Sequence, residues 1–329
     1  MSGPLAGVRV VELGGIGPGP FAGLQLADMG ADVVRIERPD AAGSPVSMTR
    51  GKRLVEVDLR STAGVAQVLD LAAEAAILIE GFRPGVAERL GLGPADCQAR
   101  NPALVYGRMT GWGQSGPWSS TAGHDINYIG LTGALHAIGR AGGPPSIPLC
   151  LVGDLGGGAM FLVTGVLAAL HEATRTGVGR VVDAAIVDGA TALMLPIHEM
   201  AAGGHWVDER GANMLDSGRP WYDVYETADG RWMSVGALED KFYAAFIALL
   251  GLSTVESDRT DPASWPGLRE RIAARFATAD REHWEKVFDG TDACVAPVLS
   301  LAEAPHHPHM AARKNLVGGV AAPAPRFAG

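Results

Sequence analysis

Short apolar runs alternate with amphipathic segments through the first half of the chain. The runs are rich in Val, Ile and Leu and predict buried strands at residues 8–13, 31–37, 76–80 and 104–109. Helical apolar spacing marks the segments 21–30 and 65–75 between them. Strands that alternate with helices favour a parallel sheet with helices on both faces. We therefore expect an α/β fold whose larger part is a Rossmann-like parallel-sheet domain.

The second half of the chain has a different pattern. After a strand and a helix within residues 179–195, a loop-like segment at 201–220 is the best candidate for a linker. Two alternating strands flank the turn Ala228-Asp229-Gly230 and predict a β-hairpin. Amphipathic helices and one more strand follow, which together indicate a smaller α+β domain. We predict a large domain over residues 1–190, a linker over 191–220 and a small domain over 221–307.

Composition limits the partners that the chain can have. Its 329 residues are 47% hydrophobic and 19% charged, which is typical of a folded globular protein. The formal net charge of -9 argues against nucleic acid as a partner. The uncharged run between Asp154 and His171 is shorter than the roughly 20 residues that span a bilayer. With no secretory signal and no SKL-type ending at Ala328-Gly329, we expect a soluble, cytoplasmic protein that has no membrane partner.

Candidate metal ligands are few and badly spaced. The three cysteines lie far apart, are odd in number and lack the spacing of zinc ligands. The histidines at 306, 307 and 309 are interrupted by proline and have no carboxylate or cysteine partner at ligand spacing. We therefore predict neither a disulfide nor a metal site.

The candidate chemistry is concentrated between residues 121 and 160. His124 follows a glycine in GHDINY, and Asp154 ends an apolar run just before three glycines at 156–158. An imidazole titrates near neutrality and burial raises the pKa of a carboxyl group, so the pair suits proton transfer at one carbon. We expect the glycines to open a helix whose free N–H groups stabilise an enolate oxygen. The competing interpretations are a structural histidine and an aspartate that only caps the helix.

A dinucleotide-binding motif is the rival interpretation of the first loop. Gly17, Gly19 and Ala22 fit G-x-G-x-x-A, and Glu37 follows at the usual spacing for binding a ribose hydroxyl. Two prolines within the motif, however, remove N–H groups from the loop that would hold the diphosphate. No constellation for hydride transfer follows downstream, so we rank this interpretation low.

The whole pattern resembles a known family. GHDINY, and VGD before three glycines, are similar to signatures of the α-methylacyl-CoA racemases within the family III CoA-transferase superfamily. The resemblance covers nearly the whole chain, including LAGVRVVEL, GADVVRIERP, LIEGFRPGVAERLG, RMTGWGQSGP and GRPWYDVYETADGRWMSVGALEDKFY. It implies an isomerase without a separate cofactor, because coenzyme A (CoA) is part of the acyl-CoA substrate. It also implies an interlocked homodimer in which residues 308–329 return to the large domain.

The resemblance also implies roles for individual residues. Arginines that match Arg38 and Arg89 contact CoA in the family, and guanidinium groups suit the phosphates of CoA. For Arg60 and Arg83 a merely solvated side chain is the equal alternative. The full set that we assign to CoA binding is Arg38, Val57, Arg60, Arg83, Arg89, Asp125 and Tyr128.

The leading hypothesis is a 2-methylacyl-CoA racemase that uses two bases and an enolate. His124 removes the α-proton from one face, and protonated Asp154 delivers a proton to the other. By resemblance, Glu239 of the partner subunit orients His124; the alternative is an acid placed favourably in the first turn of a helix. The second hypothesis is a family III CoA-transferase with Asp154 as nucleophile, against which a histidine at 124 argues. A CoA-binding protein without catalysis is ranked last, and the preferred acyl chain stays open.

Overall fold

The computed structural model describes residues 3–39, 46–253 and 257–327. Within it the chain forms two compact units. The first unit comprises Met1–Leu135, Ile147–Pro196 and Val320–Gly329, and the second comprises His136–Ser146 and Ile197–Gly319. The prediction that the chain has no peroxisomal signal rests on its last two residues. These lie outside the described residues.

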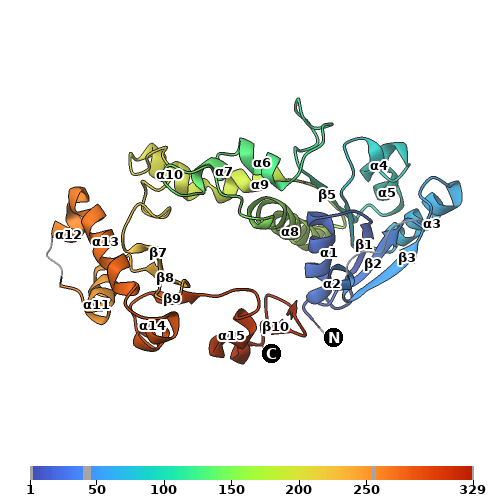
Figure 1. Ribbon diagram of the computed structural model, residues 1–329. Coiled ribbons are helices and arrows are strands. Elements are labelled where there is room, and N and C mark those ends of the chain that lie inside the picture. The colour runs from blue at the N-terminus through green and yellow to red at the C-terminus, as the bar shows by residue number, and fades with distance from the viewer. Residues whose placement is uncertain (1–2, 40–45, 254–256, 328–329) are drawn as a thin grey trace. The chain divides into compact units, whose positions relative to one another are not determined.

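A six-stranded parallel sheet is the centre of the first unit (Figure 1). Its strands are β1 (Arg9–Leu13), β2 (Asp32–Glu37), β3 (Lys52–Glu56), β4 (Ile77–Glu80), β5 (Val105–Thr110) and β6 (Val181–Ala185). They lie in the order β3-β2-β1-β4-β5-β6, which is the order of dinucleotide-binding Rossmann folds. The predicted α/β fold with a parallel sheet is confirmed. The strand β3 was not predicted, because its sequence KRLVE is largely exposed and shows no apolar run.

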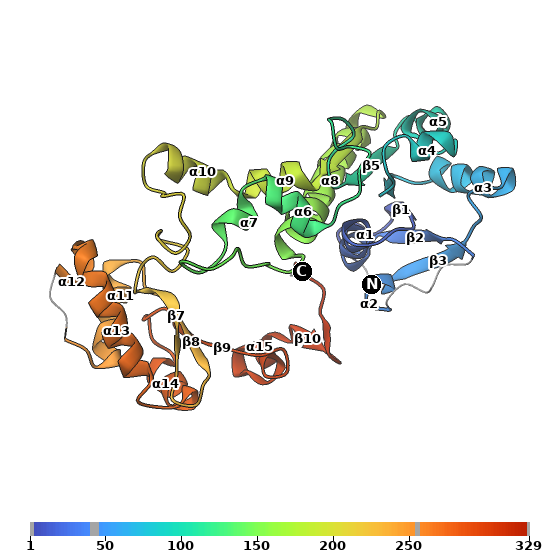
Figure 2. The ribbon, with the colours of Figure 1, turned by 45° about the horizontal axis from the view of Figure 1, so that its top comes forward.

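Helices cover both faces of this sheet (Figure 2). Successive side chains of a strand point to opposite faces, so Val10 packs toward α1 (Pro18–Asp28) and α8 (Phe161–Thr176). Val11 packs with the opposite layer, which contains α3 (Thr62–Ala73) and α5 (Pro94–Arg100). The short helices α2 (Val46–Thr49) and α4 (Val86–Arg89) belong to the connections between strands. Burial of both apolar layers stabilises the sheet by about 25 cal/mol for each Å² removed from water.

A buried ionic network crosses three neighbouring strands of the sheet. Glu12 on β1 forms ion pairs with Arg35 on β2 and with Lys52 on β3, and none of the three side chains is more than 2% exposed. Burial raises the pKa of Glu12 and lowers the pKa of Lys52. Arg35 also donates to the carbonyl of Gly15 at 3.0 Å, and Lys52 to that of Pro20 at 2.7 Å. The network therefore fixes the loop that follows β1 and the first turn of α1.

The helix predicted to begin at the three glycines begins earlier. A π-helical segment, η1 (Leu151–Met160), contains them and continues directly into α8. The glycines instead allow close packing against α9 (Ile186–Leu193), because a Cβ on Gly189 would lie 1.8 Å from the carbonyl oxygen of Gly157. The prediction of a helix N-terminus at these glycines was wrong. Their small size, not free N–H groups, is what this part of the fold uses.

Together η1 and α8 form a continuous helix, Leu151–Thr176. By length and composition alone it could cross a membrane, and it is longer than the uncharged run seen in the sequence. Its apolar residues Leu162, Val163 and Val166 lie in the core beneath the sheet, beside β5. The buried part of this apolar helix therefore has a structural explanation within the first unit. The helices α6 (Asp125–Leu131) and α7 (Ala134–Ala137) precede it.

The second unit is built on a three-stranded antiparallel sheet. The strands β7 (Tyr222–Glu226), β8 (Trp232–Gly236) and β9 (Val295–Val298) lie in that order, and the predicted hairpin around Ala228-Asp229-Gly230 is confirmed. Aromatic side chains, among them Phe246, Phe276 and Trp284, fill its core. The other elements that follow α9 in the chain are α10 (Leu195–Ala202), α11 (Asp240–Leu250), α12 (Ser257–Thr260), η2 (Pro262–Ser264), α13 (Trp265–Phe276), α14 (Arg281–Phe288), η3 (Ala304–His306), α15 (Pro308–Arg313), β10 (Leu316–Val317) and β11 (Val320–Ala321). Of these, β11 belongs to the first unit.

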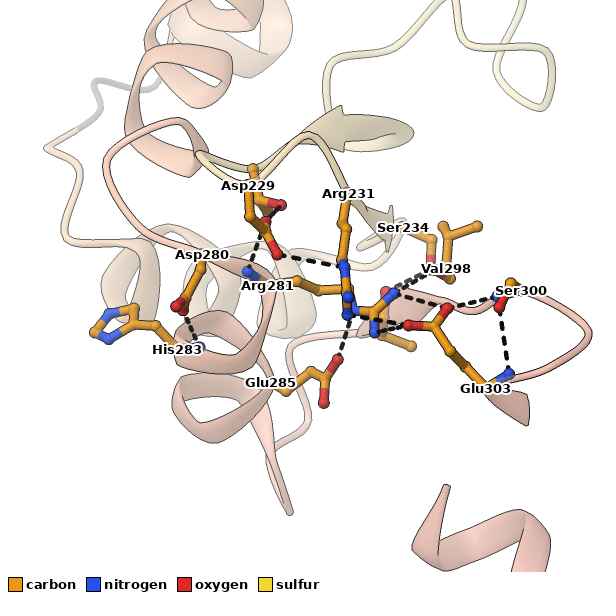
Figure 3. Close-up of polar contacts among 12 residues, drawn as sticks. Asp229, Arg231, Ser234, Asp280, Arg281, His283, Glu285, Val298, Ser300 and Glu303 are labelled. Atoms are coloured by element: carbon orange, nitrogen blue, oxygen red, sulfur yellow. Dashed lines mark hydrogen bonds and ion pairs between the residues drawn. The ribbon is translucent and has the colours of Figure 1, made fainter. Parts of the chain in front are cut away.

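Arg281 joins several elements of the second unit (Figure 3). Its guanidinium group binds Glu285 on the same helix, the carbonyl of Val298 at the end of β9, and Glu303. Its backbone N–H donates to Asp229 in the hairpin turn. Hydrogen bonds from Arg281 and from Ser300 lower the pKa of Glu303 to about 2. The contacts tie the hairpin, the start of α14 and the segment after β9 into one structure.

Candidate active site

A cavity of about 410 Å³ lies in the first unit at the carboxyl edge of the parallel sheet. It is lined by segments that follow β1, β4 and β5 and by part of the loop before α6: Leu13, residues 15–20, Ile79, residues 81–84, 109–112, Ser119, residues 121–124, Tyr128, Asp154 and Ile186. The strand order reverses between β1 and β4, and open parallel sheets bind ligands at the carboxyl ends of such strands. The cavity is therefore in the expected place for a ligand site.

Both predicted bases line this cavity. His124 ends the loop after β5 and precedes α6, and its backbone N–H donates to the Oδ1 of Asn127 at 3.0 Å, which fixes the start of the helix. Asp154 lies in the first turn of η1 and is half-buried. A Cβ on Gly17 would lie 3.3 Å from the Oδ2 of Asp154, so the loop after β1 closely approaches this carboxyl group. Two segments distant in sequence thus bring an imidazole and a carboxyl group to one cavity.

The electrostatic environment of Asp154 favours its protonated form. Burial raises its pKa to about 6, and the negative charge of Asp125 adds to this shift, while His124 opposes it. The Oδ2 of Asp125 accepts the backbone N–H of Asp154 at 2.6 Å. Asp125 was assigned to CoA binding from the sequence, but its side chain is directed to the backbone of η1 and is only 7% exposed. A carboxyl group with this pKa can hold or release a proton near neutral pH.

An aromatic wall beside His124 was not found from the sequence. Trp112 meets Tyr128 edge to face at a centroid distance of 4.7 Å and meets Trp118 at 5.0 Å. The hydroxyl group of Tyr128 donates to the carbonyl of Gly123, the residue before His124. Two tryptophans in a loop rich in Gly and Ser were the available signal, because such a loop has little other reason to hold large apolar rings. The rings of Trp112 and Tyr128 therefore add an aromatic surface to the lining of the cavity, whereas His124 itself is exposed.

The arginines proposed for CoA binding all follow strands of the same sheet. Arg83 lines the cavity, whereas Arg38, Arg60 and Arg89 are exposed and do not line it. Within the described ranges, none of these four side chains forms an ion pair with a carboxylate. The carboxyl edge of the sheet therefore carries guanidinium groups that are not held in an ion pair with a described carboxylate.

The remaining predicted residues lie in different environments. Tyr128 lines the cavity, but the side chain of Val57 is 3% exposed and packs in the core beside α3. Glu239 belongs to the second unit, where it is the exposed residue that precedes α11 and makes no capping hydrogen bond with its side chain. Glu239 therefore contributes to the start of α11 only through its backbone carbonyl, which accepts the N–H of Tyr243 at 2.9 Å.

The glycine motif after β1 does not form a typical diphosphate-binding turn. Gly17 precedes α1 with a φ of 69°, and prolines occupy the first and third positions of that helix. Only Gly19 retains an N–H group among these first three positions, which is too few to cradle a diphosphate. Among the described residues there is also no group of three His, Cys, Asp or Glu side chains placed to hold a metal ion.

Comparison with known proteins identifies the family. Residues 5–319 match the model of the family described as CoA-transferase family III. The chain belongs to CoA-transferase family III. The α-methylacyl-CoA racemase of Mus musculus is 45% identical to it, over 98% of this chain and 85% of that protein. A succinyl-CoA–D-citramalate CoA-transferase of Chloroflexus aurantiacus is 32% identical, over 96% of this chain and 83% of that protein.

Solved structures of the family share the fold. A CaiB/BaiF family protein from Brucella suis superposes with a TM-score of 0.85 at 25% identity, over 99% of this chain and 93% of that one. The predicted resemblance to this family and to the α-methylacyl-CoA racemases is confirmed. The names of these relatives include two activities, racemisation and CoA transfer.

Proposed function

We propose that this family III protein is a 2-methylacyl-CoA racemase that interconverts the (2R) and (2S) thioesters. The observation that carries the proposal is the pairing of His124 with Asp154 in one cavity at the switch point of the sheet. The 45% identity to an α-methylacyl-CoA racemase over nearly the whole chain supports the same reaction. The enzyme is accordingly an isomerase, and CoA enters as part of its substrate.

The reaction moves one proton between the two faces of a single carbon. His124 accepts the α-proton of one epimer, and the resulting enolate takes a proton on its other face from Asp154. Reverse turnover exchanges the two roles. The raised pKa of Asp154 supports this scheme, because a carboxyl group with a pKa of about 6 keeps a protonated fraction near neutral pH that can act as the donor. The thioester oxygen gains negative charge in this step, so backbone N–H groups around the cavity are the candidate donors to it.

Recognition of CoA is assigned to the cationic edge of the sheet. Arg38 follows β2, Arg60 follows β3, and both Arg83 and Arg89 follow β4. A guanidinium group binds phosphate oxygens in a bidentate manner. Tyr128 adds an aromatic surface at the cavity. Val57 contributes by shaping the end of β3, since its side chain is in the core.

We assign a homodimer to the protein and place it in the cytoplasm. Leu151, Met160, Phe161 and Leu193 are large apolar residues of η1, α8 and α9 that stay between 39% and 58% exposed. Apolar residues gathered on contacting helices are typical of a surface that another chain covers. In this arrangement the partner subunit's Glu239 orients His124 and stabilises its protonated form.

A CoA-transferase remains the second candidate, because family III relatives at 32% identity carry that name. In that reaction Asp154 attacks the thioester as a nucleophile, which requires the ionised carboxylate. A pKa of Asp154 raised to about 6 leaves less of the ionised carboxylate at mildly acidic pH. In addition, an imidazole beside the thioester has no role in the transfer reaction. Trapping a covalent aspartyl-CoA intermediate would favour this candidate.

The first experiment is incubation of the protein in D2O with each epimer of a 2-methylacyl-CoA. Deuterium uptake at the α-carbon and convergence of both epimers to one mixture are expected. His124→Ala and Asp154→Asn should each lower inversion by about 10²–10⁴-fold, because each removes one positioned acid or base. Either variant can still exchange the proton of the epimer that faces its remaining base. Full inversion in either variant removes that residue from the mechanism.

A further inference from the structure

Asp125 is a buried aspartate that the two-base scheme leaves without a role. It is the first residue of α6, directly after His124, and only 7% of it is exposed. Its Oδ2 accepts the backbone N–H of Asp154 at 2.6 Å. Its Oδ1 is buried and has no hydrogen-bond partner among the described residues. One side chain therefore connects the helix next to one base with the helix that carries the other.

The contact between Asp125 and η1 is closely fitted. A Cβ on Gly153 would lie 2.4 Å from the Oδ2 of Asp125 and 3.0 Å from a methyl group of Ile129. The residue before Asp154 therefore has to be a glycine while Asp125 is in place. Ile129 also packs in an apolar cluster with Val152 of η1, so the contact around the carboxylate is otherwise apolar. In this apolar environment, the carboxylate of Asp125 has a role other than hydrogen bonding to water.

Asp125 acts on Asp154 through its charge as well as through its hydrogen bond. After burial, the charge of Asp125 is the next cause that raises the pKa of Asp154, and His124 opposes it. Tyr128 on α6 also faces this group, and its pKa is raised by burial and by the charge of Asp154. From the side of α1, the closest approach to the carboxyl group is the backbone of Gly17. Within the described residues, the fixed negative charge nearest this proton donor is thus Asp125.

We propose that Asp125 is a positioning residue for the racemase reaction proposed above: it holds the backbone of Asp154 in place and keeps a negative charge behind its carboxyl group. A nearby negative charge makes ionisation less favourable, so Asp154 retains the proton that it must deliver. The hydrogen bond keeps η1 in the same position beside the cavity after that proton has left. Asp125 itself does not contact the substrate in this arrangement.

The test separates the charge of Asp125 from its hydrogen bond. Asp125→Asn keeps an oxygen that accepts the N–H of Asp154 but removes the charge. The limb of the pH profile of kcat/KM for α-deuterium exchange that reports the ionisation of Asp154 should therefore move to lower pH, by roughly half a unit or more. Asp125→Ala removes both contributions, so we expect the same shift and a kcat lowered by about tenfold or more through misplacement of Asp154.

A matched control is available on a second helix packed against η1. Asp188 is an exposed aspartate in the first turn of α9, and Asp188→Asn changes the net charge equally. We expect this variant to keep the wild-type pH profile. A profile for Asp125→Asn that equals the wild-type profile would overturn the proposal, as would an equal shift in the control.

A second readout keeps the proposal independent of the reaction. In ¹³C NMR, the carboxyl group of Asp154 should titrate near pH 6 in the wild type and at lower pH in Asp125→Asn. If Asp154 titrates at the same pH in Asp125→Asn as in the wild type, the positioning role is overturned, even when α-deuterium exchange is fast. If the wild-type protein exchanges no α-deuterium, the proposed reaction fails, and the titration still decides the role of Asp125. If the variant does not fold, slow hydrogen exchange of the Asp154 amide in the unchanged protein supports the bond, and rapid exchange overturns it.

Discussion

At the scale of the single residue, Asp154 combines a catalytic requirement with a cost in stability. Its pKa is raised from the ordinary value of 3.8 to about 6, chiefly by burial. At neutral pH the folded protein therefore contains an ionised group in an environment that disfavours its charge. The same environment that suits Asp154 to its proposed role as a proton donor must lower the free energy of unfolding.

This cost has a definite dependence on pH. Below about pH 4 the carboxyl group is protonated in both the folded and the unfolded chain, so it has no effect on their equilibrium. Between about pH 4 and pH 6 only the unfolded chain ionises, and stability falls as pH rises. Asp154→Asn should therefore raise the melting temperature at pH 7 by on the order of a few degrees, since the half-exposed group is partly screened.

Thermal unfolding followed by circular dichroism at several pH values measures this effect. The advantage of Asp154→Asn should disappear below about pH 4, where the two proteins differ only in a neutral side chain. An advantage that is the same at pH 4 and pH 7 would mean that burial of the charge is not its cause.

At the scale of the element, the packing of η1 on α9 decides where Asp154 lies. A Cβ on Gly189 would meet the backbone of Gly157, which cannot move without displacing η1. Gly189→Ala should therefore lower the free energy of unfolding by about 1–3 kcal/mol and also reduce racemisation. Gly130→Ala is the matched control, because a Cβ at that helical position meets nothing within 4 Å.

Chemical denaturation and the exchange assay distinguish the two glycine variants. Gly130→Ala should raise stability by about 0.5–1 kcal/mol and leave the activity unchanged, because alanine favours the helix. Equal effects of the two substitutions would show that the close approach of η1 and α9 is not what requires glycine.

The segment η1 also shows what could not be predicted from the sequence. Strong apolar runs located most strands of the parallel sheet, because those strands are buried on both faces. His124 and Asp154 were proposed as bases because His124 follows a glycine in GHDINY and Asp154 ends an apolar run just before three glycines. The start of η1 was missed, because the partner that requires the glycines is Gly189, a contact made only in the folded chain. The direction of the Asp125 side chain was likewise not encoded in the local pattern.

Glu303 controls the response of the second unit to acid. Its pKa of about 2 lies below the ordinary value of 4.5, so its bonds stabilise the fold fully above about pH 4.5. This contribution is lost as the pH falls toward 2, where Glu303 becomes protonated. Glu303→Gln should therefore lower the melting temperature at pH 7, with a difference from the wild type that shrinks in acid.

A control for this prediction lies on α14. Glu282 pairs with Lys286 one turn away, and both side chains are more than 70% exposed. Glu282→Gln should change the melting temperature little, since exposed pairs are weak. If Glu303→Gln behaves in the same way, the Arg281 contacts of Figure 3 do not hold the second unit together.

At the scale of the whole molecule, the proposed dimer makes a prediction about how sites are shared. In the proposed assembly, His124 and Asp154 of one chain work with the partner subunit's Glu239. A chain with His124→Ala and a chain with Glu239→Ala are each expected to be poorly active alone. Co-expressed, they form heterodimers in which one of the two sites has all three residues intact.

Activity of the co-expressed pair measures this arrangement. If the chains pair at random, about half of the dimers are mixed, so roughly a quarter of the wild-type activity should return. A pair that stays as inactive as its parents would place Glu239 in the site of its own chain or in none. Light scattering on the same samples shows whether dimers are present.

The network of Glu12, Arg35 and Lys52 governs how the sequence can diverge. Removing Glu12 leaves the Lys52 ammonium group without its carboxylate partner in the core, a change that costs about 3–5 kcal/mol, and removing Arg35 or Lys52 leaves the buried charges unbalanced. Position 23 is constrained by the same network, because a Cβ on Gly23 would lie 1.9 Å from a carboxylate oxygen of Glu12. These four positions are therefore strongly epistatic: each single substitution is selected against, whereas a joint replacement by apolar residues of matching volume is tolerated. Homologues should carry the four residues as a block, either all retained or all exchanged.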